Sequence, residues 1–175
     1  MLERPADHAG ADRGSGTADN SLGNSWPVVV AELLCAKYYG LCCCVESLGE
    51  GPAASRGVVD VYSVNGMLLH HLVSNGPSSP LNEPWGLAIA PKGFGPFGGD
   101  LLVGNLGNGW INAFNPTTGK FLGTLDDSTG YPITIPGLWG LMVGNTAFGG
   151  PSSLVFSAGP NGYNNGVLGI LNPAG

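Results

Sequence analysis

The chain has 175 residues, including 31 glycines and 14 prolines, with 43% hydrophobic residues and a formal net charge of −6. Only six Lys and Arg are present and they form no basic stripe, which disfavours binding to nucleic acid or to an anionic membrane surface. Glycine and proline exceed their averages of about 7% and about 5%, yet the hydrophobic content is that of a folded protein rather than a low-complexity one.

Residues 1–25 are rich in Ala, Asp, Gly, Ser and Asn and show no apolar periodicity. Such a segment buries too little apolar surface to offset the entropy lost on ordering, so the sequence predicts a disordered tail. The tail has four acidic residues against two arginines, whereas a secretory signal needs a basic start and a short apolar core. No intact signal peptide is therefore recognised.

An apolar stretch follows at 26–48 and is interpreted as two strands, 27–34 and 38–46, that begin the folded region. A membrane span is not predicted, because Glu32 and Lys37 would lie near its middle, where a charged residue costs about 2.5–3.5 kcal/mol. The four cysteines fall here, at Cys35, Cys42, Cys43 and Cys44. Alternation along a strand would separate Cys43 from its neighbours, so buried small residues, or a mis-translated start, are favoured over a metal site.

The chain then repeats itself. Trp85 and Trp139 lie 54 residues apart, Gly57 and Gly109 lie 52 apart, and Gly109 and Gly166 lie 57 apart. Each unit contains four short apolar runs, which predict strands at 85–91, 101–106, 110–115 and 121–125, then at 138–144, 153–158 and 166–171. The sequence predicts an all-β fold, a partial β-propeller of two to three four-stranded blades over 26–175, with blade repeats at 57–109 and 109–166.

Turn chemistry separates these strands. Asn65-Gly66 predicts a two-residue type I′ hairpin, in which both residues need positive φ. Residues 115–119 predict a four- or five-residue hairpin, with a proline to set φ and a closing glycine in the left-handed region. Along 110–114 polarity does not alternate, which predicts strands covered on both faces.

The length of the chain limits the number of blades that it can form. From Trp26 onward there are 150 residues, fewer than three repeats, whereas closed propellers need about 4 blades or more. The sequence therefore predicts either missing blades, in a fragment of a larger propeller, or a protomer that closes a ring by self-association.

Six segments combine strand and turn motifs: Gly57–Tyr62, Pro84–Ala88, Asp100–Asn105, Ile111–Phe114, Thr118–Gly123 and Leu138–Leu141. Together they resemble a family of largely uncharacterised bacterial β-propeller proteins related to NHL-repeat propellers, over about residues 57–171. The resemblance implies a fold of about six blades and export from the cell, but no established activity. Residues 1–56 do not resemble the preceding blades of that family, which a truncated or mis-started gene model would explain.

Four residues are weak candidates for ligand binding. Trp85 and Trp139 open successive repeats, where a propeller strand lines the central channel, although such tryptophans more often pack between blades. Asn105 and Asn108 follow a strand end, where polar side chains would reach one rim, with turn formation as the alternative.

Other patterns favour structural roles. The glycine pattern at 93–98 resembles a dinucleotide-binding loop, but it leads into a strand instead of a helix, so an ordinary loop is predicted. His70 and His71 should point to opposite faces of a strand, one packed and one solvated, with no carboxylate at a recognisable spacing. Residues 126–130 and 161–166 offer oxygen atoms for Ca²⁺ but fit turns better.

We therefore expect a non-catalytic binding or scaffold module whose ligand or protein partner is unknown. The alternative is a propeller-type hydrolase or lyase with a metal in its channel, incomplete in this chain. A truncated chain without activity of its own is the third interpretation. No catalytic or cofactor-binding residue is assigned.

Overall fold

The computed structural model describes residues 57–173 and the backbone of 28–32. The strands are β1 (Val28–Glu32), β2 (Val58–Tyr62), β3 (Leu68–Val73), β4 (Pro84–Ile89), β5 (Leu101–Asn105), β6 (Ile111–Phe114), β7 (Phe121–Thr124), β8 (Leu138–Val143), β9 (Leu154–Ala158) and β10 (Val167–Leu171). One 3-10 turn, η1 (Gly95–Phe97), is the sole helical element in this part of the chain. The predicted tail at 1–25, the predicted strand at 38–46 and all four cysteines lie outside the described residues.

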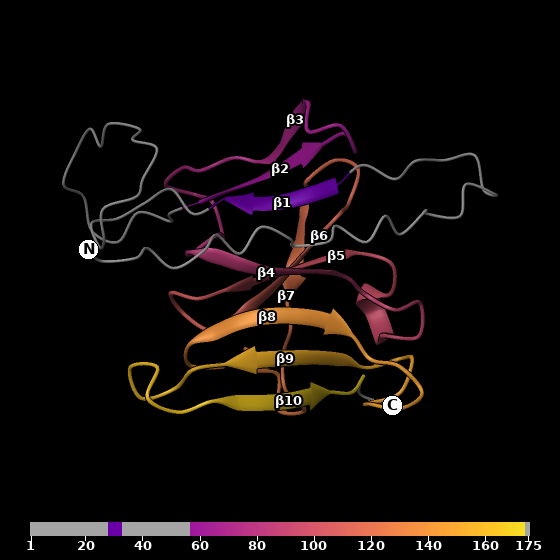
Figure 1. Ribbon diagram of the computed structural model, residues 1–175, viewed down its shortest axis with the longest axis vertical. Coiled ribbons are helices and arrows are strands. Elements are labelled where there is room, and N and C mark those ends of the chain that lie inside the picture. Colours follow the sequence, from indigo (N-terminus) through magenta and orange to yellow (C-terminus); the bar gives the residue numbers. More distant parts are fainter. Residues whose placement is uncertain (1–27, 33–56, 174–175) are drawn as a thin grey trace, which may run out of the picture.

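The strands form three antiparallel sheets, and the all-β prediction is confirmed. Their orders are β1-β2-β3, β4-β5-β6-β7 and β10-β9-β8. Figure 1 shows the three sheets following one another along the long axis, with β8 beside β4. Each of the seven strands predicted between residues 85 and 171 is present, with ends within two residues of the prediction. In the described segments, no helix is long and apolar enough to cross a membrane.

The middle sheet, β4–β7, is covered on both faces. Every residue of β5 and β6 is buried, because alternate side chains serve two separate cores. Leu101, Val103 and Phe114 pack toward the β1–β3 sheet, while Leu102, Ile111 and Ala113 pack toward the β8–β10 sheet. This confirms the prediction from the unbroken apolar pattern at 110–114.

The β2–β3 turn differs from the type I′ prediction. Gly66 has φ +80°, but Asn65 is not in the positive-φ region that a type I′ turn requires. The Gly66 N–H donates to the Ser63 carbonyl, and the Ser63 N–H donates to the Met67 carbonyl. This is the three-residue turn closed by a left-handed glycine, which Val64 allows because it can occupy the ordinary helical region.

The β6–β7 hairpin forms as predicted. Gly119 closes it with φ +67°, and the Asn115 Oδ1 accepts hydrogen bonds from the N–H groups of Thr117 and Thr118, at 3.0 and 2.8 Å. A Cβ on Gly119 would collide with the Leu72 carbonyl of β3. The hairpin therefore needs glycine both for its backbone conformation and for its close approach to the neighbouring sheet.

The glycine pattern at 93–98 is an inter-strand loop, as predicted. Its only helical element is the single turn η1, and the chain re-enters a strand at Leu101. The loop is closed by two backbone bonds, from the Ala90 N–H to the Asp100 carbonyl and from the Gly99 N–H to the Ala90 carbonyl.

Candidate functional site

Two tryptophans are presented by the same local irregularity in two neighbouring strands. The β4–β5 register skips from Pro84 to Gly86, and the β8–β9 register skips from Leu138 to Gly140. Trp85 and Trp139 are thus the extra residues of two β-bulges, which re-aim a side chain away from the regular sheet face. They are 51% and 41% exposed, unusually open for residues of this size.

The backbones of β4 and β8 approach closely between these bulges. A Cβ built on Gly86 would lie 2.7 Å from the carbonyl oxygen of Trp139 and 3.0 Å from the amide nitrogen of Leu141. Because these neighbours are backbone atoms, no side chain at position 86 fits without moving the strands apart. Glycine here brings the two tryptophan-bearing strands together.

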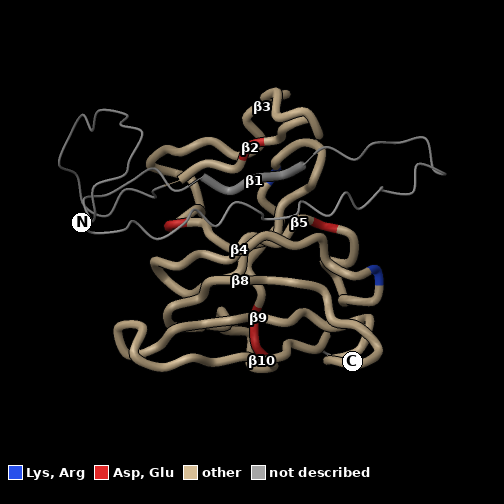
Figure 2. Tube along the Cα trace, viewed as in Figure 1, with Lys and Arg blue, Asp and Glu red and all other residues tan. Residues whose placement is uncertain are grey.

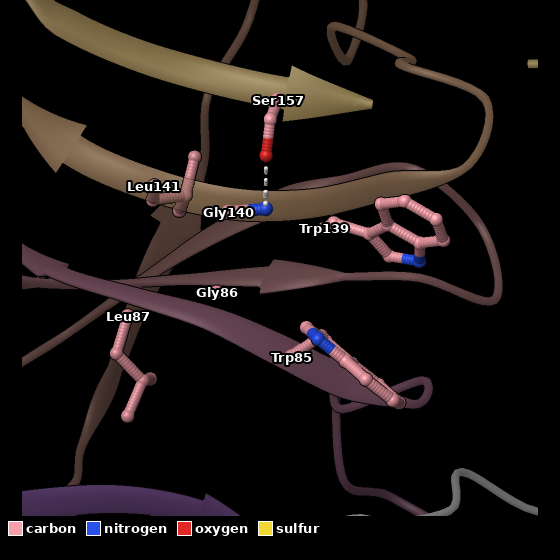
Figure 3. Close-up of a pocket in the computed structure, with 7 residues that line it drawn as sticks. All are labelled: Trp85, Gly86, Leu87, Trp139, Gly140, Leu141 and Ser157. Carbon is pink, nitrogen blue, oxygen red and sulfur yellow. Dashed lines mark hydrogen bonds between the residues drawn. The ribbon is translucent and has the colours of Figure 1, made fainter. Parts of the chain in front are cut away.

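Around this contact lies an open groove of about 530 Å³ (Figure 3). It is lined by Trp85, Gly86, Leu87, Trp139, Gly140, Leu141 and Ser157. No lining residue is charged, and the Ser157 Oγ accepts a hydrogen bond from the Gly140 N–H at 3.1 Å. The groove therefore offers two indole surfaces, glycine backbone and one hydroxyl group to a neutral ligand.

The indole ring of Trp139 is fixed in position by a stacked aromatic side chain. Trp139 stacks on Tyr163 from the β9–β10 connection, with ring centroids 5.2 Å apart and planes 11° from parallel. Tyr163 has φ +66°, a conformation that is uncommon for a residue with a side chain. The strained loop positions the tyrosine ring and thereby orients one wall of the groove.

The side chains of Asn105 and Asn108 form hydrogen bonds with backbone groups in and next to the β5–β6 turn. Asn105 is fully buried; its Oδ1 accepts from the Asn82 N–H at 2.8 Å and its Nδ2 donates to the Trp110 carbonyl at 3.3 Å. The Asn108 Oδ1 accepts from the Trp110 N–H at 3.1 Å. This geometry favours the turn-forming alternative, and neither residue lines the groove.

The expectation that one of the two adjacent histidines is packed is wrong. Both His70 and His71 are exposed, so neither is packed in the core. His71 also has a carboxylate partner, because its Nδ1 lies 2.7 Å from the Oδ1 of buried Asp60 on β2. The β2–β3 register places these two residues opposite each other, and that pairing was not visible in the sequence spacing.

The two acidic or amide-rich segments form turns. In 161–166 the Asn161 Nδ2 donates to the Asn165 Oδ1 at 2.9 Å. In 126–130 the Asp127 Oδ1 accepts from the hydroxyl and the N–H of Thr129, at 2.6 and 2.8 Å. Within 28–32 and 57–173, no group of three or more His, Cys, Asp or Glu is placed to hold a metal ion.

The turn at Asp127 should loosen in acid. The Thr129 hydroxyl, then the Thr129 and Tyr131 N–H groups, lower the pKa of the Asp127 carboxyl. A lowered folded-state pKa stabilises the turn above the unfolded-state pKa, and this contribution is lost as pH falls through the folded value. We expect a carboxyl ¹³C NMR titration to give a higher midpoint in Thr129→Val than in the wild type; equal midpoints would contradict this cause.

Sequence reasoning identified the two tryptophans but not the rest of the groove. Gly86, Gly140, Ser157 and Tyr163 were not predicted as site residues. The Trp-Gly pair at 85–86, repeated at 139–140, is the signal that was available, since a bulky residue followed by glycine suits a bulge and a close strand contact.

Comparison with known proteins gives relatives but no function. The uncharacterized protein L690 of Acanthamoeba polyphaga mimivirus is 37% identical over 117 residues, and the uncharacterized protein R648 of the same virus is 33% identical over 120 residues. The matches cover 66% and 67% of this chain but only 29% and 28% of those proteins. No protein-family model matches the chain. Similarity is thus to part of two longer viral proteins.

Proposed function

We propose that the three sheets are successive blades of a β-propeller, with β4 and β8 as the innermost strands of two neighbours. The supporting observation is that the 54-residue repeat reproduces the strand order, the pairing register and the bulged tryptophan. The 52-residue spacing aligns β2 with β6, which makes β1 equivalent to β5. In agreement, β1 contacts β4 as β5 contacts β8. Membership of an NHL-related bacterial family, and export, stay predictions.

We further propose that the molecule is a binding module without a reaction of its own, and that the groove between β4 and β8 is its contact surface. The observation that carries this is the pair of half-exposed indoles on adjacent strands above an uncharged floor. Large aromatic surfaces left in water gain free energy when a ligand covers them. The ligand class that fits is a neutral molecule with a flat apolar face, either an aromatic ring or the C–H face of a sugar.

Titration of the ¹⁵N-labelled chain with two probes, 2-naphthol and cellohexaose, tests this function. We expect one of them to shift the indole N–H signals of Trp85 and Trp139. An aromatic stacking contact contributes about 0.5–1.5 kcal/mol to the binding free energy, in addition to the contribution of the buried apolar area. Trp85→Ala or Trp139→Ala should therefore weaken binding about tenfold or more.

Trp110→Phe is the matched control. Trp110 is 38% exposed and its Nε1 donates to the Thr134 Oγ1 at 3.1 Å, but it does not line the groove. The affinity should be unchanged in this variant. If neither probe moves the two indole signals, or if Trp110→Phe weakens binding as much as the groove variants, the groove is not the contact surface.

A further inference from the structure

The β8–β10 sheet has one apolar face that no other sheet of the described structure covers, although the loop at Gly149 packs over its centre at Val155. We call this face the outer face, and it is defined by Met142, Phe148, Leu168 and Ile170, which are 55%, 42%, 63% and 40% exposed. No Lys, Arg, Asp, Glu or His occurs from residue 128 to the end of the chain, so β8, β9 and β10 are tan in Figure 2, where the red stretch between β9 and β10 belongs to another segment of the chain. An exposed sheet face and edge without any charge is a typical association surface.

The outer face repeats a surface that is buried one unit earlier. The strand registers align Ile111 with Leu168 and Ala113 with Ile170. The 54-residue repeat aligns Phe94 with Phe148. In the middle sheet these residues are at most 6% exposed, because they pack against the β8–β10 sheet. The outer face therefore has the residue pattern of a surface that receives another sheet.

We propose that a second copy of this chain covers the outer face with its β1–β3 sheet. Among the described residues the middle sheet contacts a sheet on each face, whereas the β1–β3 sheet contacts another sheet with one face only, through Val59, Val61, Leu72 and Val73. Its opposite face presents Tyr62 and Leu68, which pair across β2 and β3, beside the buried Asp60 and its partner His71. The contact is head to tail and continues the order in which each sheet of the chain packs on the one before it.

Ring closure follows from the number of sheets. The described residues of one copy form three sheets, so those of two copies would form six, within the range of about 4–8 blades seen in closed propellers. A head-to-tail contact that closes uses the same pair of surfaces at both junctions. The proposal stands on the face pattern and does not depend on ligand binding in the groove.

Light scattering of the purified chain tests the proposal. We expect a mass twice the 17.8 kDa of one chain. Leu168→Glu on the outer face and Leu68→Glu on the β1–β3 face should each give monomers. An equimolar mixture of the two should regain dimers held by one junction, at which both surfaces are wild type, while the second junction carries both glutamates. Leu122→Glu on β7 is the control: Leu122 is 42% exposed but lies on neither surface, so the dimer should persist.

Several results would overturn the proposal. A monomeric wild type would mean that the outer face is not covered by a second copy and is left for a sheet from a longer chain. A dimer that survives Leu68→Glu but not Leu168→Glu would mean that two outer faces pair with each other. Unchanged circular dichroism spectra in all three variants would exclude unfolding as the cause of any change in mass, as expected for exposed leucines.

Discussion

Replacing Phe114 with alanine should lower the free energy of unfolding by about 3–5 kcal/mol. Phe114 is 1% exposed and lies in the core between the middle sheet and the β1–β3 sheet. Its removal leaves a cavity that the two sheets fill only partly, because alternate residues of β5 and β6 hold the middle sheet against the opposite core as well. Urea denaturation followed by circular dichroism measures the loss.

Phe121→Ala is the comparison for this effect. Phe121 is 43% exposed and meets Phe114 edge to face, with centroids 5.6 Å apart. Its loss removes the aromatic contact, worth about 0.5–1.5 kcal/mol, but opens no buried cavity. If the two variants lose equal stability, the packing between the sheets is not what holds the middle sheet.

Asn105→Ala should cost about 1–3 kcal/mol, because it leaves the partly buried Asn82 N–H without its acceptor. The Asn82 N–H donates to the Asn105 Oδ1, and this bond ties the segment before β4 to the end of β5. The Trp110 carbonyl is affected less, since it also accepts from the Asn105 backbone N–H at 2.9 Å. Denaturant unfolding again provides the measurement.

Asn108→Ala is the matched control for Asn105. Asn108 bonds one N–H of the same turn but is partly exposed, so water can replace its oxygen and the loss should stay under about 1 kcal/mol. A larger loss at Asn108 than at Asn105 would show that the turn itself, and not the buried amide, is the main stabilising element.

The strands were predictable because their apolar runs recur at a fixed spacing between glycines. Residues 110–114 even indicated burial on both faces, since Ile111 and Phe114 interrupt any polar alternation. The turn after β2 was less predictable: Asn-Gly suits two hairpin geometries, which the φ of Asn65 and the hydrogen bonds of Ser63 distinguish.

The site was predictable only in part, because its geometry depends on register. The sequence marks Trp85 and Trp139 as equivalent, but their exposure comes from bulges that shift the pairing between strands. Likewise, Asn105 resembles any turn-forming asparagine in the sequence, but its side chain accepts a hydrogen bond from the N–H of Asn82, which is 23 residues earlier in the chain. Contacts of that range leave no local sequence pattern.

The packing of each sheet on its predecessor has a consequence for how such chains change over evolution. The two cores are separate, and each is built from the facing residues of two neighbouring sheets. Duplication or deletion of a whole unit of about 54 residues would thus create or remove one core and leave the others intact. A deletion that ends inside a unit would instead leave the apolar residues of one sheet without the facing residues that complete their core. Insertion or removal of sequence should therefore be tolerated best where one unit ends and the next begins.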